Sequence, residues 1–480
     1  MAKDEDFYTN KIQKVFNYIL NDNSSRFNKE KKIAMGSILG AFLGDSIGSY
    51  YEFQKFPEPS DRIILKEESP IFGILPGQVT DDSELALASS FGILDSNGNF
   101  NLNKVAFHNA VWTTTQPFDA GNTMRSSLST INDKPIYQKL NGNYFNYLNK
   151  CDVSHDIAMY FPNIYSENIV KKALEKNFNS LSNGFLMRKT PISILSMKLV
   201  KHERVELNQD HISDLETFER LHKAECSLTH SNPLALDITV VYGLLVTRLI
   251  YIKNHYESLN HKEVIENALN YLNGYVEGLV KRDLNNFFDT YKTGKVIPES
   301  DYFKSFKYKY DFLNDLIYQI KEGKSNIIKF SDFNTKSFGY FALALYTVFY
   351  YLHKLKNGNF NSFSLYNIMK EIIVLGGDTD TNSCICGGVL GIIFGPSNLI
   401  QRDLLNVLLN CNVINSKRKR PIIYSPGFAL FFIYAFYKMR ERDHDNKKDF
   451  LFNDSPKPIS AAIFSLLFTI DKIEEIEFDI

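Results

Sequence analysis

Two short acidic clusters carry the residue types that could bind a hard metal cation. The first is Thr80-Asp81-Asp82-Ser83, and the second is Asp378-Thr379-Asp380-Thr381, which follows a glycine pair. Carboxylates this close repel one another unless a cation lies between them, and oxygen-only ligands favour Mg2+, Mn2+ or Ca2+. Either cluster alone could equally be an acidic helix start that the helix dipole stabilises. Because both stand where a loop is predicted to enter a helix, the pair favours a site for two cations.

Other polar residues could complete a ligand site, although each has an ordinary structural explanation. Glu52 follows a predicted helix, where it is either a movable carboxylate near a cation or a solvated loop residue. The segment around Asp119 and Asn122 is typical of a turn before a helix. The segment around Asn183 is typical of a helix N-terminus, which could bind an anion or simply be capped. His230 precedes another predicted helix, and such a histidine is more often structural than catalytic.

Two rows of glycine must position the clusters. Gly36, Gly40, Gly44 and Gly48 recur every fourth residue within a predicted helix over Ile33–Tyr51, and the segment after Asp380 carries the row Gly387, Gly391 and Gly395. Glycine inside a helix costs roughly 1 kcal/mol relative to alanine, so a row of them needs a packing reason. We predict that these two helices cross in close contact.

The stretch Gly44-Asp45-Ser46-Ile47-Gly48 matches the G-x-S-x-G pattern of a hydrolase nucleophile elbow. That elbow requires a strand before the serine and a helix after it. The preceding residues predict a helix instead, so the sequence argues against a serine nucleophile.

The long patterned segments are helical, and no segment shows convincing strand alternation, so the predicted fold class is all-α. We expect an N-terminal extension over 1–30, a catalytic domain over 31–400, and a C-terminal helical extension over 401–480 that packs on the domain. Residues near 131–180 and 254–335 are interpreted as insertions. The basic run Lys417–Arg420 is interpreted as a solvated loop.

Composition limits the partners and the compartment. The chain has 480 residues with 54 Lys+Arg and 55 Asp+Glu, which gives no electrostatic reason to expect nucleic acid or an anionic membrane. Five scattered cysteines fit a reducing compartment, and Cys384 and Cys386 are interpreted as buried packing residues. The most apolar runs, Phe338–Leu352 and Phe428–Tyr437, are shorter than the ~20 residues that span a bilayer. Without a signal-peptide pattern, we expect a soluble, cytoplasmic protein, and we expect a monomer.

Taken in order, these motifs resemble those of ADP-ribosylglycohydrolases of the dinitrogenase-reductase-activating type. The resemblance runs from about Ile33 to Gly395. It implies an orthogonal all-α helical fold with two Mg2+ or Mn2+ ions at the ends of buried helices. It also implies release of ADP-ribose from a modified protein side chain, arginine or serine, or from a small ADP-ribose conjugate. The segments that carry it are Gly44-Asp45, Glu52, Thr80–Ser83, Asp119–Asn122, Asn183-Gly184, Met187-Arg188, Thr229-His230 and Gly376–Thr381.

Carried over by position, the resemblance implies a role for each matching residue. The implied metal ligands are Thr80, Asp81, Asp82, Asp378, Asp380 and Thr381. The implied catalytic carboxylates are Glu52, Asp81 and Asp82. The implied substrate contacts are Asp119, Gly121, Asn122, Thr123, Asn183, Gly184, His230 and Tyr340. Two positions depart from the family pattern, because Ser83 stands where threonine is usual and Ser182 where glycine is common.

Two other functions remain open from the sequence. The first is a non-catalytic relative on the same fold, an ADP-ribose-binding or crystallin-like protein. Retention of the acidic residues argues against it, because clustered carboxylates without a use are costly. The second is a serine hydrolase that uses Ser46, and sensitivity to chelators rather than to serine-directed reagents would separate it from a metal enzyme.

Overall fold

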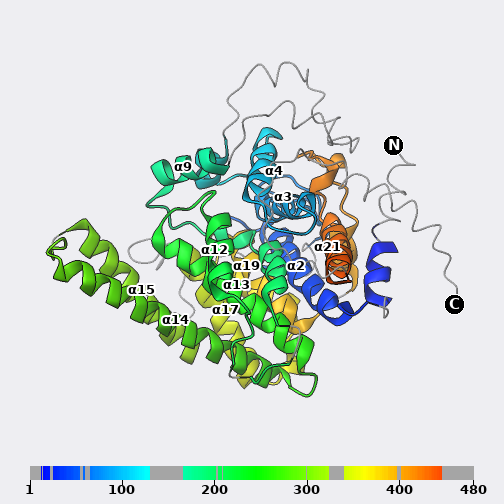
Figure 1. Ribbon diagram of the computed structural model, residues 1–480. Helices are drawn as coiled ribbons and strands as arrows, with labels where there is room; N and C mark the ends of the chain where they lie inside the picture. The colour runs from blue at the N-terminus through cyan, green and yellow to red at the C-terminus, as the bar shows by residue number, and fades with distance from the viewer. Residues whose placement is uncertain are drawn as a thin grey trace.

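The computed structural model describes residues 12, 14–21, 25–54, 58–59, 65–129, 166–201, 204–207, 209–298, 300–323, 340–396 and 402–445. None of these residues lies in a β-strand, an isolated antiparallel bridge joins Val200 to Ile212, and the predicted all-α class is confirmed (Figure 1). The helices are α2 (Asn28–Gly48), α3 (Asp81–Asp95), α4 (Leu102–Thr114), α5 (Asn122–Leu128), α9 (Ser166–Asn177), α10 (Gly184–Met187), α11 (Thr190–Leu195), η1 (Ser196–Leu199), α12 (Leu215–Cys226), α13 (Pro233–His255), α14 (His261–Lys292), α15 (Asp301–Glu322), α17 (Tyr340–Asn357), η2 (Phe360–Ser362), α18 (Leu365–Val374), α19 (Thr379–Phe394), α20 (Arg402–Leu409), η3 (Val413–Asn415), η4 (Ile422–Tyr424) and α21 (Phe428–Asp445).

Helices α2 and α19 cross in backbone contact at the centre of the fold, as the glycine rows predict. A Cβ atom added at Gly36 would lie 2.6 Å from the carbonyl oxygen of Gly391, and one added at Gly48 would lie 2.5 Å from the Cα atom of Asp380. Gly395 is the exception in the predicted row, because a Cβ there would meet nothing within 4 Å. It instead ends α19 with a φ of 72°. The crossing therefore places the end of α2 beside the first turn of α19.

The G-x-S-x-G match lies inside α2 and has no strand before it. Its serine, Ser46, is buried in the middle of a helical turn. The interpretation that this match is not a nucleophile elbow is confirmed, because the strand–turn–helix geometry of the elbow is missing here.

Helix α13 contains the apolar segment that the sequence analysis underestimated. It is long and apolar enough to cross a membrane by length and composition, with a mean hydropathy of 1.7. The choice of Phe338–Leu352 and Phe428–Tyr437 as the most apolar runs therefore overlooked this helix. However, 94% of that stretch is buried inside the protein, and the Tyr242 hydroxyl donates to the Ile385 carbonyl of α19 over 2.9 Å. Its apolar composition matches its position in the core.

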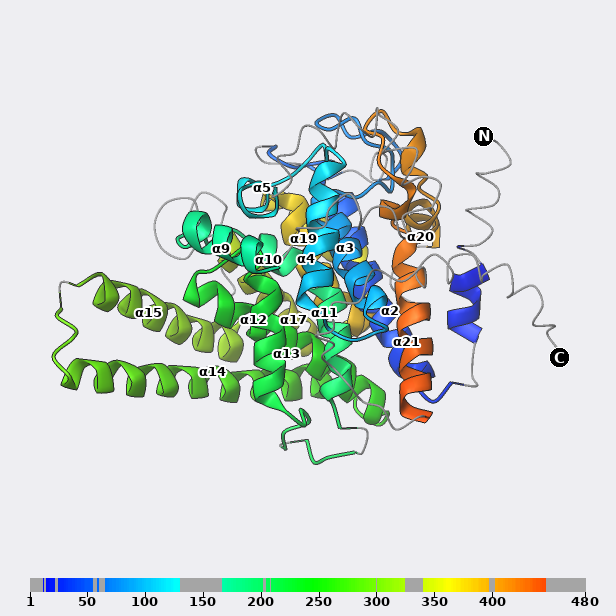
Figure 2. The same ribbon diagram turned by 45° about the horizontal axis from the view of Figure 1, so that its top comes forward.

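Helices α14 and α15 form an antiparallel pair that projects from the body (Figures 1 and 2). Figure 2 shows α14 running across the direction of α12 and α13. Both helices lie within the predicted insertion at 254–335. Ring packing joins the pair toward its outer end, where the Phe287 and Phe306 centroids are 4.1 Å apart. Residue 299 and residues 324–335 of this predicted insertion lie outside the described residues.

The other predicted insertion, near 131–180, is described only from residue 166 onward, and this part is joined to the body. Residues 130–165 lie outside the described residues, but α9 follows them. The side chain of Asn177, the last residue of α9, donates to the carbonyls of Thr123 and Thr229, each over 2.9 Å. Helix α9 therefore links two segments that the resemblance places in the substrate pocket.

Both predicted extensions have described parts that pack on the body. The helical residues 14–21 lie beside α21 (Figure 2), and the rings of Tyr18 and Tyr434 are 5.3 Å apart. Helix α21 is joined to α2, because the Tyr437 hydroxyl donates to Glu30 over 2.8 Å and Arg440 pairs with the same carboxylate.

The predicted solvated loop Lys417–Arg420 is solvated only in part. Its first three residues are exposed, but Arg420 is buried and pairs with Glu84 of α3 at 2.7 Å. The sequence interpretation is wrong for Arg420, because its partner lies more than three hundred residues away in the chain.

The prediction for the two close cysteines is confirmed. Cys384 and Cys386 are free and buried, and their Sγ atoms face the carbonyl oxygens of Met187 and Ala344. Burial raises the pKa of the Cys384 thiol well above its usual value, as expected for a packing residue rather than a reactive thiol.

Candidate metal centre

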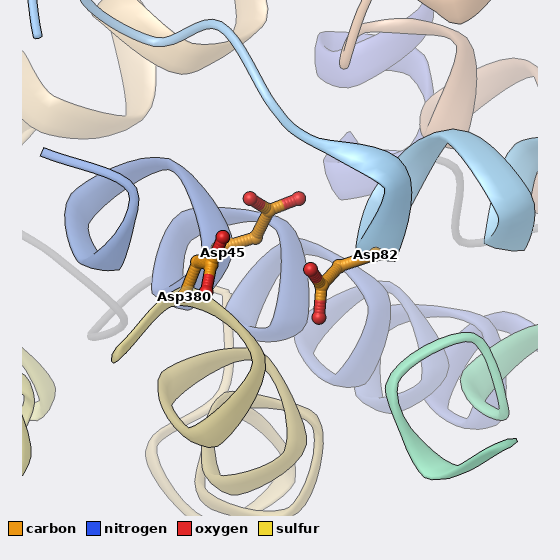
Figure 3. A group of neighbouring side chains, drawn as sticks. All are labelled: Asp45, Asp82 and Asp380. Atoms are coloured by element: carbon orange, nitrogen blue, oxygen red, sulfur yellow. The ribbon is translucent and has the colours of Figure 1, made fainter. Parts of the chain in front are cut away.

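Three helices each place one carboxylate in the space where they meet (Figure 3). Asp45 lies near the end of α2, Asp82 in the first turn of α3, and Asp380 in the first turn of α19. One carboxylate oxygen from each residue lies within 4.8 Å of the other two. All three residues are buried. Oxygen ligands at this spacing suit a hard divalent cation.

A second group of carboxylates overlaps the first. One oxygen each of Glu52, Asp119 and Asp380 also lies within 4.8 Å of the other two. Asp380 therefore belongs to both groups, and its carboxylate could help to hold a cation in either of them. The pairing of Asp82 with Asp380, expected from the two acidic clusters, is thus observed.

The two ends of the crossing helices fix where Asp380 lies. Gly376 and Gly377 have φ values of 74° and 78°, which only glycine adopts without strain. They turn the chain so that Asp378 becomes the N-cap residue of α19. The Thr379 hydroxyl then donates to the Gly48 carbonyl over 2.7 Å, and the same oxygen accepts from the Tyr51 backbone N–H over 2.9 Å. These bonds join the end of α2 to the start of α19.

Asp45 is a site residue that the sequence analysis did not assign to any role. Its carboxylate accepts hydrogen bonds from the backbone N–H groups of Thr80 and Ser83, at 3.1 Å each. It also accepts from their hydroxyls, at 2.9 and 2.5 Å. Asp45 therefore caps the start of α3 from another helix, and Ser83 supplies the hydroxyl that threonine would. The available signal was a carboxylate inside an otherwise apolar, glycine-lined helix.

The donor set fits a divalent cation. The hydroxyls of Thr80 and Thr381 lie 2.9 and 3.4 Å from Asp82 Oδ2. The remaining oxygen of Asp82, Oδ1, is buried without a hydrogen-bond partner, and so is Glu52 Oε2. Buried oxygens without donors are costly unless something positive binds them, and these two belong to residues of different groups.

Asp81 and Asp378, two predicted ligands, stand beside the groups rather than within them. Asp81 accepts from the Gly121 backbone N–H over 3.3 Å, and repulsion from Asp119 adds to the effect of burial in raising its pKa. Asp378 accepts from the Asn183 amide over 2.8 Å. Each therefore ties a segment of the predicted substrate pocket to the acidic clusters.

Glu52 is buried rather than solvated, which removes one of the two sequence interpretations. Only 3% of the Glu52 surface is exposed to solvent. The next residue, Phe53, donates its backbone N–H to the Gly377 carbonyl over 3.1 Å. This bond holds the turn after α2 against the glycine pair, and so keeps Glu52 at the centre.

Burial and mutual repulsion make the charged forms of these carboxylates unfavourable and raise their pKa values. Burial raises the pKa of Asp45 to about 7, against the hydrogen bonds that it accepts. Burial, with added repulsion from Asp119 and other carboxylates, raises the pKa of Glu52 to about 9. Burial raises the pKa of Asp119 to about 6, with repulsion from Asp378 as the next cause. The pKa values of Asp81, Asp82 and Asp380 are likewise raised well above the usual range, first by burial. Without a cation, the cluster must hold protons near neutral pH.

This charge balance predicts an unusual dependence of stability on pH. In the presence of EDTA, we expect the free energy of unfolding to fall as the pH rises from about 4 to about 9. The folded protein keeps protons on Asp119, Asp45 and Glu52 up to pKa values of about 6, 7 and 9, whereas the unfolded chain releases them near about pH 4. A carboxyl group with a raised folded pKa contributes stability below its unfolded pKa and loses it as the pH rises through the folded pKa.

Added Mg2+ should reverse this trend, because cation binding requires deprotonated ligands. The measurement is thermal unfolding at about pH 5, 7 and 9, with EDTA or with Mg2+ at matched ionic strength. The difference in unfolding temperature between the Mg2+ and EDTA samples should increase with pH. A metal-free protein that becomes steadily more stable between these pH values would contradict the prediction.

The predicted substrate contacts form a hydroxyl-rich chain next to the acidic groups. The Thr123 hydroxyl lies 3.4 Å from that of Ser182, which lies 2.7 Å from His230 Nε2. His230 Nδ1 lies 2.9 Å from the Thr229 hydroxyl. Both ring nitrogens of the buried His230 are therefore occupied within the protein. Its observed position is that of a residue that orients Ser182, the position where the family pattern commonly has glycine.

The other predicted contacts differ in exposure. Gly121 and Asn122, at the start of α5, are exposed, and a Cβ at Gly121 would meet nothing within 4 Å. Gly184 has no free space beside it, because a Cβ there would overlap the Met124 side chain. Tyr340 begins α17 with 45% of its surface exposed, and the residues before it lie outside the described ranges.

A buried ion group that the sequence analysis missed holds the turn that carries Asn183. Arg188 Nε donates to Glu225 Oε1 over 2.6 Å, and Lys189 pairs with the same carboxylate. Arg188 Nη2 also donates to the Thr229 hydroxyl over 2.8 Å. The turn after Asn183 is thereby fixed against the segment that ends at His230.

Comparison with known proteins identifies the family. The ADP-ribosylglycohydrolase family model matches residues 27–424. A protein of Acanthamoeba polyphaga mimivirus, named as an ADP-ribosyl glycohydrolase, is 27% identical over 409 residues, which cover 81% of this chain and 94% of that protein. The ADP-ribosyl-dinitrogen reductase glycohydrolase of Rhodospirillum rubrum is 32% identical over 220 residues, 45% of this chain and 58% of that protein. A solved ADP-ribosylglycohydrolase-related protein complex aligns with a TM-score of 0.48 at 14% identity, over 86% of this chain and 99% of that chain.

The family match begins inside the predicted N-terminal extension and ends beyond residue 400. It includes all the acidic residues of the two groups and the buried Arg420. The resemblance inferred from the motifs is confirmed by this match. The chain belongs to the ADP-ribosylglycohydrolase family, and it is a hydrolase.

Proposed function

We propose that this protein is a metal-dependent hydrolase that cleaves the glycosidic bond between ADP-ribose and a nitrogen or oxygen atom of a modified protein side chain. The observation that supports the proposal is the pair of carboxylate groups that share Asp380. We propose that the two overlapping groups hold two cations, which are Mg2+ or Mn2+. The product is free ADP-ribose.

We propose Thr80, Asp81, Asp82, Asp378, Asp380 and Thr381 as the residues that hold the cations, as the resemblance implies. Asp45 is close enough to join them, but its oxygens already accept four hydrogen bonds from Thr80 and Ser83. Its proposed role is therefore to orient Thr80. Glu52 and Asp119 complete the second group, and Glu52 keeps one oxygen free of donors.

When bound, divalent cations neutralise the clustered carboxylates, help to hold ribose hydroxyls, and lower the pKa of water from ~15.7 towards ~7. Glycosidic cleavage passes through a state with positive charge at C1″ of the ribose. We propose that the carboxylates of Asp81 and Asp82 stabilise that charge. We propose that Glu52 Oε2 takes or returns the proton during cleavage, because it is buried and has no donor of its own.

The side chain to which ADP-ribose is attached is the open part of the proposal. The Rhodospirillum rubrum relative acts, by its name, on ADP-ribosylated dinitrogen reductase. The segment Asn183–Pro191 resembles the arginine-directed bacterial form, whereas Gly48–Glu52 resembles the serine-directed branch. A small ADP-ribose conjugate is the third substrate that we propose to test.

The decisive experiment compares two peptides, one ADP-ribosylated on arginine and one on serine, and a small conjugate. Each is incubated with the protein and Mg2+ or Mn2+, and released ADP-ribose is measured with and without EDTA. Release that EDTA abolishes would support the function and identify the linkage. Cation binding without release from any substrate would instead favour an ADP-ribose-binding protein.

A variant of Ser46 distinguishes the proposed metal enzyme from a serine hydrolase. Because Ser46 lies inside α2 rather than at a strand–helix turn, Ser46→Ala should keep its activity within about threefold. Loss of activity in Ser46→Ala, together with resistance to EDTA, would favour a serine hydrolase over the proposed metal enzyme.

A further inference from the structure

Arg420 forms a buried hub between two segments that carry site carboxylates. Its Nε atom donates to both oxygens of Glu84, at 2.8 and 3.0 Å, and its Nη2 donates to Glu84 Oε2 at 2.7 Å. Its Nη1 and Nη2 atoms donate to the carbonyl and the hydroxyl of Thr115, at 2.7 Å each. The residue is 1% exposed, so these bonds form away from water.

Both partners stand next to residues of the metal centre. Glu84 is two residues beyond Asp82, in the first turn of α3. Thr115 is the C-cap residue of α4, and the loop that follows leads to Asp119. That loop begins with Gln116 at a φ of 54°, a left-handed conformation that a residue other than glycine keeps only when its surroundings fix it. Arg420 holds the residue before this turn through two bonds.

We propose that Arg420 is a positioning residue, which fixes the start of α3 and the Asp119 loop relative to one another and so sets the cation affinity of the centre. The inference rests on the proposed function, because it assumes that the carboxylates bind divalent cations. It concerns a residue that contacts no carboxylate of the two groups and that lies beyond the end of the recognised motifs.

The charge of Arg420 matters as well as its geometry. Glu84 lies in the same helical turn as Asp81 and Asp82, and would add a further buried negative charge to a centre that already has an excess. The guanidinium group balances it, and the Trp112 indole N–H also donates to Glu84 Oε2 over 2.7 Å. A buried carboxylate left without its partner is strongly unfavourable, and the start of α3 would have to move to relieve it.

The chain next to Arg420 supports the same segment. The Arg418 carbonyl accepts from the side chain of Gln78 over 2.9 Å, two residues before Thr80. A Cβ at Gly77 would lie 2.5 Å from the Val407 carbonyl oxygen. The segment from Val407 to Arg420 is thus fitted against the approach to α3 at several points.

The chain offers a matched control for a purely structural role. Arg440 is 2% exposed and pairs with the buried Glu30, and it joins α21 to α2. Its pair resembles the Arg420–Glu84 pair in chemistry and burial, but Glu30 lies near the start of α2, whereas Asp45 lies near its end. Loss of Arg440 should reduce stability without changing the cation site.

The test measures Mn2+ affinity by calorimetry, and the stability of the same samples in EDTA, for wild type, Arg420→Lys, Arg420→Met and Arg440→Met. Lysine keeps the charge but cannot form the forked bonds of arginine. We expect Arg420→Met to weaken Mn2+ binding by about 10- to 100-fold, as the loss of residues that orient ligands does. Arg420→Lys should give an intermediate loss, and Arg440→Met should bind Mn2+ within about twofold of wild type.

Each outcome decides the inference. If Arg420→Met and Arg420→Lys are folded and bind Mn2+ within about twofold of wild type, the inference is wrong. Equal losses of affinity in Arg440→Met and Arg420→Met would also overturn it, because general destabilisation would then explain both. If Arg420→Met does not fold, Arg420→Lys and Thr115→Val carry the test, since Thr115→Val removes one bond to the hub. If wild type itself binds no divalent cation, the proposed function fails instead.

Discussion

Replacing Asp380 with asparagine is expected to abolish both cation binding and the release of ADP-ribose. Asp380 is the residue common to both carboxylate groups, so the change weakens both cation positions at once. We expect a loss of at least about 10^3-fold in kcat/KM, equal to about 4 kcal/mol of transition-state stabilisation. The measurements are the steady-state release of ADP-ribose from the substrate that wild type accepts, and Mn2+ binding by calorimetry.

A stability measurement separates this effect from misfolding. Repulsion from other carboxylates contributes to the raised pKa of Asp380, so Asp380→Asn should be at least as stable as wild type in EDTA. Asp95→Asn is the matched control. Asp95 is a buried aspartate at the opposite end of α3 from Asp82, and its Oδ2 atom lies 3.4 Å from Lys104 Nζ. Its activity should stay within about threefold of wild type. An active, EDTA-sensitive Asp380→Asn protein would refute the assignment.

The second large effect is expected from Gly44→Ala at the helix crossing. A Cβ at this position would overlap the Ser383 carbonyl oxygen and lie 2.9 Å from the Cys384 backbone nitrogen. Both contacts are with backbone, which cannot rotate away as a side chain can. We expect a loss of about 3 kcal/mol in the free energy of unfolding, the upper range for overpacking. Cation affinity should also fall, because the change separates Asp45 from Asp380.

The long helix α14 supplies the control for this substitution. Gly274 and Gly278 lie within α14, and a Cβ at either meets nothing within 4 Å. Gly274→Ala should therefore stabilise the protein by about 0.5 to 1 kcal/mol through helix propensity alone. Denaturant midpoints of the two variants measure the contrast. If Gly44→Ala matched Gly274→Ala in stability, the close approach of α2 and α19 would be refuted.

The local chemistry of the chain was sufficient to predict several elements. Glycine at every fourth position predicted the crossing of α2 and α19, because close backbone approach is the main reason for a helix to carry such a row. The pair Gly376-Gly377 predicted the turn before α19. The two acidic clusters predicted where carboxylates would gather, since the requirement for a neutralising cation depends on residue type and proximity alone.

Other features depended on contacts between segments that are far apart in the sequence. Asp45 was part of a recognised motif, but its hydrogen bonds to Thr80 and Ser83 require α2 and α3 to meet. Glu52 could be either solvated or buried until the Phe53–Gly377 bond fixed the turn. Arg420 belonged to a basic run typical of a solvated loop, and only its contact with Glu84 shows that it is buried.

By itself, the sequence determined the all-α class, the family, the glycine-lined crossing and the residues that supply the carboxylates. These follow from periodicity and side-chain chemistry, which are properties of short segments. The tertiary structure decided that Asp380 is shared by two groups, that Asp119 lies with Glu52, and that distant charged residues hold the loops in place. The physical reason is that burial and electrostatic coupling depend on distances between helices, and no local pattern encodes those distances.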